Sequence, residues 1–524
     1  MILDRLRTSP SPSLSVAALA LATLAPVALS AQLIQIKTLP IADGDQWRIF
    51  PSANAPMADL SIALADSLLD PFVNPAKGAR LPDRGLFFGS PTFYSVSQNA
   101  GGGRTLPLGG LFRFGSMFGG FALALQELDT IRGNGQVFFP PVSTPVAVGG
   151  GTDPVSIPTT VTPAAPSREN RFAFASLGRS FSSRGLSLAG SVLWSGLRNI
   201  DGVDLLYTGS QGVNQHGGAF DARLGLTKEW ASTRGARTAE AILLHNRFDM
   251  THDVTWADQV FDPNTRAFLS RPRVDHNLDK TNTWGLHLAY SQPLADSGWR
   301  IGAIATTNLA SHPKLPDYQI AQVMVIPWDP GHTAAFDMGL GVSKSRGPTT
   351  LGVEAIFEPI STHTWGEAHG PMQSTSGATI PEGGKTTENQ FKFSNAILRA
   401  GAGHDLRLSS DQALRLQAGI AVRSISYGLD QTDHVAETHR HQDEHWVEWT
   451  RTWGLSFRFS DLEMRYAGRS VTGTGRPGVT PNGGVVFAAG DALTSNFLAA
   501  PAGPLTLTDV RVTTHQFSIS VPLR

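Results

Sequence analysis

The feature that most constrains this chain is a period-two alternation of apolar and polar side chains, which dominates the sequence beyond residue 80. Successive side chains of a β-strand point to opposite faces of the sheet, so each alternating segment predicts a strand with one apolar face. In residues 412–423, for example, Leu416 and Ile420 fall on one face while Arg415 and Gln417 fall on the other. A soluble β-sandwich and a membrane β-barrel both show this pattern, so other features must decide between them.

The length of the segments and their aromatic ends favour a membrane barrel. The segments run about 10–16 residues, whereas soluble strands usually have about 5–6 and bilayer-crossing strands need about 9–11. The apolar faces often end in an aromatic residue, as expected of the girdles at the two membrane interfaces. These residues are Trp194, Trp230, Trp284, Tyr290, Trp299, Trp453 and Tyr466.

The spacing of the strands also indicates an outer-membrane barrel. We predict sixteen strands, at 86–97, 107–115, 118–128, 170–181, 186–197, 218–231, 237–249, 282–293, 299–309, 334–345, 350–361, 390–408, 412–428, 448–460, 461–470 and 512–523. Their connections alternate between short turns and long loops, the latter at 129–169, 198–217, 250–281, 310–333, 362–389, 429–447 and 471–511. Short periplasmic turns and long extracellular loops are typical of such barrels. The expected fold class is therefore all-β: a transmembrane antiparallel barrel of fourteen to sixteen strands, sixteen by this count.

Composition fits a closed sheet between lipid and a lumen. Only 16% of the residues are charged, against roughly 25% in soluble domains, and the chain contains 54 Gly. A net charge of -1 provides no basic field for nucleic acid, so we expect no such partner. With no Cys, disulfides, thiolate metal sites and cysteine nucleophiles are excluded.

The N-terminus indicates export. A basic flank, an apolar run from Leu14 to Leu29 and the small residues Ser30 and Ala31 predict a signal peptide over residues 1–31. No later stretch of about 18 uncharged apolar residues suggests a membrane helix. We therefore expect the chain in the outer membrane of a Gram-negative-type bacterium, with membrane lipids and the barrel assembly machinery as partners.

Residues 32–85 do not alternate and form a segment of their own before the barrel at 86–524. A small-residue stretch at 53–65 leads to Asn74-Pro75-Ala76, just before the strand-like residues that start at Leu86. This arrangement resembles the N-terminal hatch of the FadL-like (OMPP1/TodX) outer-membrane transporters of hydrophobic compounds. The resemblance implies a plug inside the lumen, with Asn74, Pro75 and Ala76 at the gating position. A mobile periplasmic tail is the alternative.

No catalytic motif is present, so we expect neither an enzyme nor a cofactor. Lumen-facing charges of mixed sign would pair across strands. A sharper hypothesis is that the arginines bind the carboxylate of an amphipathic solute, since Arg suits bidentate recognition. The candidates are Arg399, Arg415, Arg423, Arg458 and Arg465.

The His-rich segment 433–445, placed in a loop, offers metal-ligand residue types, but we expect a solvated loop there and assign no metal site. Loop 136–166 carries apolar residues that could provide a first contact for hydrophobic solutes.

These observations leave two main functions open. The first is passive uptake of hydrophobic or amphipathic small molecules, of the fatty acid or aromatic hydrocarbon class, through a hatch-gated lumen. The second is a structural or partner-binding barrel that serves secretion or surface attachment and transports no solute. A general polar porin is disfavoured because a hatch would obstruct its pore.

Overall fold

A computed structural model describes residues 42, 44–81, 84–98, 100–129, 168–201, 203, 212–230, 235–262, 267–294, 298–312, 319–320, 323–324, 330–368, 370–477 and 507–523. The predicted signal peptide, residues 1–31, and the loop 136–166 lie outside these residues. None of the described helices is long and apolar enough to cross a bilayer.

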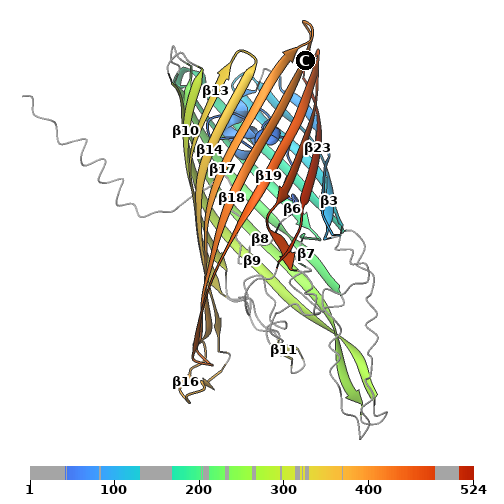
Figure 1. Ribbon diagram of the computed structural model, residues 1–524, viewed down its shortest axis with the longest axis vertical. Helices are drawn as coiled ribbons and strands as arrows, with labels where there is room; N and C mark the ends of the chain where they lie inside the picture. The colour runs from blue at the N-terminus through green and yellow to red at the C-terminus, as the bar shows by residue number, and fades with distance from the viewer. Residues whose placement is uncertain are drawn as a thin grey trace, which may run out of the picture.

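The described chain is almost entirely β-structure (Figure 1). The main sheet consists of β1 (Leu86–Gly89), β2 (Thr92–Val96), β3 (Gly102–Phe114), β4 (Met117–Asp129), β5 (Arg168–Phe181), β6 (Leu186–Leu197), β7 (Gly212–Trp230), β8 (Arg237–Asp262), β9 (Ala267–Leu294), β10 (Trp299–His312), β13 (Gly331–Arg346), β14 (Thr349–Glu367), β17 (Lys385–Arg407), β18 (Gln412–Asp433), β19 (Thr438–Phe459), β20 (Leu462–Thr472) and β23 (Val512–Pro522). Three short ribbons pair β11 (Gln319–Ile320) with β12 (Val323–Met324), β15 (Met372–Gln373) with β16 (Thr379–Ile380), and β21 (Gly475–Pro477) with β22 (Leu507–Asp509). The helices are η1 (Ala55–Met57), α2 (Asp70–Val73), η2 (Pro75–Arg80) and η3 (Ser182–Arg184).

The sheet closes into an antiparallel barrel in which neighbours in sequence are neighbours in space. Both β1 and β2 pair with β3 on one side and with β23 on the other. They are therefore two halves of one strand, interrupted at Ser90 and Pro91 because proline has no N–H to donate to the ladder. Counting these halves as one, the 17-stranded sheet is a sixteen-stranded barrel, which confirms the predicted number.

Two predicted loops are wrong, because the strands continue through them. Residues 250–281 were expected to connect two strands, but β8 reaches Asp262 and β9 begins at Ala267. Residues 429–447 were also expected to be a loop, but they complete the β18–β19 hairpin, whose turn occupies only 434–437. Both hairpins project at the end opposite the short turns, and β14 and β17 extend alongside the β18–β19 hairpin (Figure 1). Away from the bilayer both faces of a strand can be polar, so the alternation that marks a membrane strand disappears.

The two faces of the barrel wall differ as the alternation predicts. The outward-facing apolar residues are highly exposed, including Leu123 at 63% and Leu340 at 68%. The inward-facing polar residues are buried, including Asn170 at 0% and Glu354 at 2%. A closed sheet with an apolar outer surface satisfies every backbone hydrogen bond within lipid. The protein is therefore a β-barrel of the Gram-negative outer membrane, with its short turns on the periplasmic side.

Residues 44–81, which we call the plug segment, lie inside the barrel (blue in Figure 1). The helix η1 contacts β17, β18, β19 and β20, while η2 contacts β3, β4, β5, β6 and β7 on the other side. Phe72 of α2 joins a buried cluster with wall residues Phe88 and Phe174, and its ring stacks on Phe50 at 4.2 Å between centroids. Contacts on both sides of the lumen hold this segment within the barrel.

Glycines of the wall create the space that the plug segment occupies. A Cβ built on Gly302 of β10 would lie 2.3 Å from the carbonyl oxygen of Ile62. A Cβ on Gly401 of β17 would lie 2.7 Å from the carbonyl oxygen of Met57. Gly339, Gly341, Gly352, Gly419, Gly454 and Gly225 face plug atoms in the same way. Side chains at these positions would push the plug segment away from the wall.

Candidate functional site

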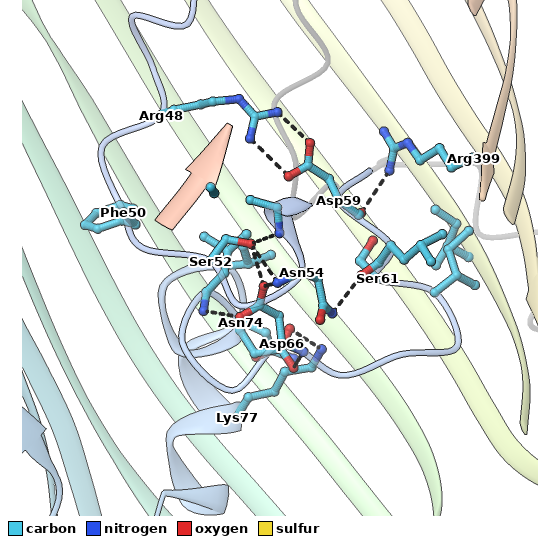
Figure 2. Close-up of a pocket in the computed structure, with 18 of the residues that line it drawn as sticks. Arg48, Phe50, Ser52, Asn54, Asp59, Ser61, Asp66, Asn74, Lys77 and Arg399 are labelled. Atoms are coloured by element: carbon cyan, nitrogen blue, oxygen red, sulfur yellow. Dashed lines mark hydrogen bonds and ion pairs between the residues drawn. The ribbon is translucent and has the colours of Figure 1, made fainter. Parts of the chain in front are cut away.

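A cavity of about 400 Å³ lies between the plug segment and the barrel wall (Figure 2). Its lining mixes apolar residues such as Phe50, Leu60 and Ile304 with charged residues such as Arg48 and Arg399. Small-molecule pockets in proteins typically measure about 300–1,000 Å³. The cavity therefore has the size and the mixed chemistry to hold a small amphipathic molecule.

Asp66 organises the plug loop that forms one side of the cavity. Its Oδ2 accepts hydrogen bonds from the Ser52 hydroxyl at 2.6 Å and from the Asn54 N–H at 2.9 Å. Its Oδ1 accepts from the N–H groups of Ala53, Leu68 and Leu69. The Asn54 side chain in turn donates to the Leu60 carbonyl at 2.9 Å. One buried carboxylate thus fixes a loop that has little regular structure (Figure 2).

A network of ion pairs and hydrogen bonds joins the start of the plug segment to Asp59 in this loop and to the barrel wall. Arg48 donates to both carboxylate oxygens of Asp59, at 3.0 and 2.6 Å, and to Asp45 at 3.1 Å. Asp45 also accepts hydrogen bonds from Arg469 of β20 and from Thr514 of β23. Burial alone would raise the pKa of Asp45, but Arg469 and Arg48 outweigh it and hold that pKa below its usual range. The network therefore attaches the start of the plug segment to the wall as charged groups.

The next part of the plug segment is attached through its backbone. Glu354 of β14 accepts hydrogen bonds from the N–H groups of Ser61, at 2.7 Å, and Ile62. Ser343 of β13 donates to the Ala63 carbonyl at 2.7 Å. Backbone donors satisfied by a charged acceptor are among the stronger hydrogen bonds in proteins. Glu354 is thus the main polar anchor for residues 61–62.

The predicted gating tripeptide lies where the plug segment turns into η2. Asn74 caps this helix by accepting from the Ala76 N–H at 3.1 Å, and its Nδ2 donates to Glu240 of β8 at 3.1 Å. Pro75 and Ala76 are buried in the first turn of η2. The structure therefore places the tripeptide at a plug–wall contact, and its gating role stays a prediction.

Beside this contact, a lysine lies between two carboxylates. Lys77 Nζ is 3.3 Å from Asp70 Oδ1 and 3.1 Å from Glu240 Oε2. Burial raises the pKa of Asp70 to about 6, with Asp66 and Glu240 acting in the same direction and Lys77 opposing them. Asp70 is thus a buried acid of the plug segment that changes charge close to neutral pH.

The five candidate arginines do not form one patch. Arg399 lines the cavity, donates to the Asp59 carbonyl at 3.3 Å and lies 3.9 Å from Glu354 Oε2. Three others have acidic neighbours: Arg423 pairs with Glu358 at 2.6 Å, Arg465 with Glu463 at 2.8 Å, and Arg415 with Asp405 at 3.7 Å. Arg458 is exposed near the periplasmic end of β19. Only Arg399 lies where a cavity-bound solute would meet it, and solute binding by any of the five stays a prediction.

The His-rich segment forms paired strands with its own internal contacts. His441 Nδ1 lies 2.6 Å from Asp430 Oδ1, and its Nε2 lies 2.7 Å from Asp443 Oδ2. Hydrogen bonds to these two carboxylates raise the pKa of His441. Within the part of the chain that the structure describes, no three His, Cys, Asp or Glu side chains are grouped as metal ligands.

Sequence reasoning missed most of the residues that form the site. Arg48, Asp59 and Asp66 lie in a stretch without periodicity, and their partners are distant along the chain. The available signal was in the wall, where Gly339 and Gly341, and likewise Gly401 and Gly403, occupy alternate positions on one face. Repeated lumen-facing glycines indicate that another backbone approaches closely.

Comparison with known proteins finds similarity only among solved structures. No family model and no curated protein matches the chain. A Pseudomonas aeruginosa FadL homologue is 12% identical over 92% of this chain and 100% of its own, with a TM-score of 0.44. The Pseudomonas putida toluene transporter TodX is 12% identical over 94% and 100%, with a TM-score of 0.36. The Neisseria meningitidis iron transporter FrpB is 10% identical over 84% and 83%, with a TM-score of 0.32.

The first two structures belong to the group that the N-terminal segment resembles. At identities of 10–12% and TM-scores below 0.5, these similarities say nothing about what the chain binds.

Proposed function

We propose that this barrel takes up hydrophobic or amphipathic small molecules passively, and that the plug segment is its hatch. The observation that supports this most directly is the plug segment itself, held on both sides of the lumen yet leaving a cavity of about 400 Å³ beside it. A general porin needs an open, hydrated pore, whereas a plugged lumen suits solutes that bind on their way through.

The inner face of β17 supports an amphipathic substrate. From the extracellular half towards the plug segment it presents Phe391, Phe393, Asn395, Ile397 and then Arg399. The two phenylalanines belong to a buried apolar cluster with Ile360, Ile425, Tyr427 and Leu429. An apolar chain gains about 25 cal/mol for each Å² that it removes from water. A solute that passes along this face would first contact apolar side chains and would then meet the Arg399 guanidinium beside the cavity. This order favours a fatty acid, which has an apolar chain and a carboxylate, over a purely aromatic hydrocarbon.

Uptake into liposomes whose outer leaflet carries lipopolysaccharide would test this function. We expect the protein to accelerate entry of a long-chain fatty acid, and deletion of residues 32–80 to change the rate. Arg399→Gln should reduce fatty acid uptake more than toluene uptake. Arg458→Gln is the matched control, because it removes an exposed arginine that does not line the cavity. If no apolar solute enters faster than in protein-free liposomes, the proposal fails.

A second candidate is a partner-binding barrel, and the long hairpins favour it. The β8–β9 hairpin, and the β18–β19 hairpin together with β14 and β17, project on the extracellular side (Figure 1). Deleting residues 252–277, the outer part of the β8–β9 hairpin, would distinguish the two proposed functions. A barrel that binds partners through this hairpin would lose them, whereas a transporter would still deliver solute.

A further inference from the structure

An arc of exposed and half-buried cations lies at the periplasmic ends of strands on one side of the barrel. Its members lie on β5, β7, β8 and β13 and in η3, which connects β5 to β6. Around the barrel, β6 lies between β5 and β7, while β9 and β10 lie between β8 and β13. The cations of this arc are Arg179, Arg184, Lys228, Arg237, Lys344 and Arg346. We call these six residues the basic arc.

Three of these cations sit over aromatic rings that face the lipid. Lys344 Nζ lies 4.7 Å from the centre of the Trp299 ring, its cross-strand partner. Lys228 Nζ lies 5.6 Å from the Trp230 ring, and Arg179 lies 5.5 Å from the Phe181 ring. Cations within about 6 Å of a ring centre are attracted to its face. Since aromatic girdles mark the membrane interface, these contacts hold the charges at the depth of the lipid headgroups.

The carboxylates nearest to the basic arc are directed away from it. Among the described residues at these strand ends, Glu229 bonds Arg80 of the plug segment at 2.6 Å. Glu240 lies 3.1 Å from Lys77, also of the plug segment. The plug segment therefore neutralises the inward acids, while the outward cations have no acidic neighbour among the described residues at these ends.

Outward cations on the extracellular halves of the strands behave differently. Arg104, Arg171 and Arg247 also face outward, but each pairs with a carboxylate, namely Glu127 at 2.8 Å, Glu169 at 3.4 Å and Asp249 at 3.4 Å. These three cations are thus neutralised by neighbouring carboxylates, whereas those of the basic arc are not paired in this way.

From this geometry we propose that the basic arc is a binding surface for anionic phospholipids of the inner leaflet, with phosphate as the recognised group. Lysine and arginine stems lie along apolar surface while their charged ends reach the interface. A cation close to an anionic membrane surface contributes about a fivefold preference at moderate ionic strength. An acidic periplasmic protein is the competing occupant. The aromatic rings beneath the cations favour lipid, since they place the charges at the membrane interface.

Lipid retention in nanodiscs made of equal parts phosphatidylglycerol and phosphatidylethanolamine would test the proposal. The full chain is extracted and its retained lipids are counted by native mass spectrometry. We expect phosphatidylglycerol to be enriched, and the enrichment to fall as salt rises. The triple variant Arg179→Gln/Lys228→Gln/Lys344→Gln should lose at least about tenfold of that enrichment.

The control variant is Arg104→Gln/Arg171→Gln/Arg247→Gln, which removes the same number of outward cations from the extracellular side. It should retain phosphatidylglycerol like the unmodified chain. Heat-dependent migration on gels establishes that each variant is a folded barrel. Equal retention of the two lipids by the unmodified chain, or an equal loss in both variants, would overturn the proposal. Cross-linking of the arc to an acidic protein in place of lipid would do the same.

Discussion

Adding methyl groups to the glycines that face the plug segment should loosen it without disturbing the barrel. In Gly302→Ala the new Cβ lies 2.3 Å from the Ile62 oxygen, whereas ordinary contacts begin at 3.4 Å. Residue Ile62 must therefore retreat by about 1 Å. In Gly401→Ala the three nearest atoms, at 2.7–2.9 Å, all belong to Met57. The strain therefore falls on the plug segment.

The size of the effect follows from the cost of overpacking. Inserting a methyl group into a filled site typically costs about 1–3 kcal/mol. Two such sites weaken plug seating by about 2–6 kcal/mol, which corresponds to at least a roughly thirtyfold rise in the opened fraction.

Hydrogen exchange at the amides of residues 55–63 measures this opening directly, because exchange reports local unfolding free energies. We expect the double variant to lose protection there while the strands keep theirs. Gly190→Ala is the matched control, since its Cβ meets only the Arg223 oxygen at an ordinary 3.7 Å. Unchanged protection of residues 55–63 in the double variant would refute the view that wall glycines seat the plug segment.

Three further outcomes are expected. Glu354→Gln keeps an acceptor for the Ser61 and Ile62 amides but removes its charge, so their exchange protection should fall about tenfold while that of distant strands holds. The buried Asp70 has its pKa raised from 3.8 to about 6, so its contribution to plug seating is fully present below about pH 4 and is lost as the pH rises through 6. In the unmodified chain, the exchange protection of the plug amides, corrected for intrinsic exchange, should therefore decrease as the pH rises from about 4 through 6. Asp70→Asn should remove this decrease, and an identical pH profile in the variant would contradict the assignment to Asp70. Leu340→Arg places a charge on the lipid face and should lower the free energy of unfolding from vesicles by about 2–4 kcal/mol; Leu408→Arg, in a periplasmic turn, should cost much less, and equal costs would place the membrane belt elsewhere.

Alternation predicted the barrel well because lipid contact imposes it residue by residue. Leu416 and Ile420 are 47% and 43% exposed on the outer face, whereas Gln417 is buried against the plug segment and donates to the Ala53 carbonyl. The same reasoning failed for 429–447, where water surrounds the strands and no face has to be apolar. It also expected lumen charges to pair across strands: Arg423 does pair with Glu358 of β14, whereas Arg465 pairs with Glu463 of its own strand.

The sequence alone determined the closed sixteen-stranded sheet, its lipid-facing side and a separate segment before it, because each of these follows from local periodicity and length. Only the tertiary structure decided the site. The contact between Arg399 and Asp59 joins residues 340 positions apart, and Glu354 meets Ser61 across 293. Closure of the barrel brings such residues together, and no local pattern in the chain encodes which wall position faces which part of the plug segment.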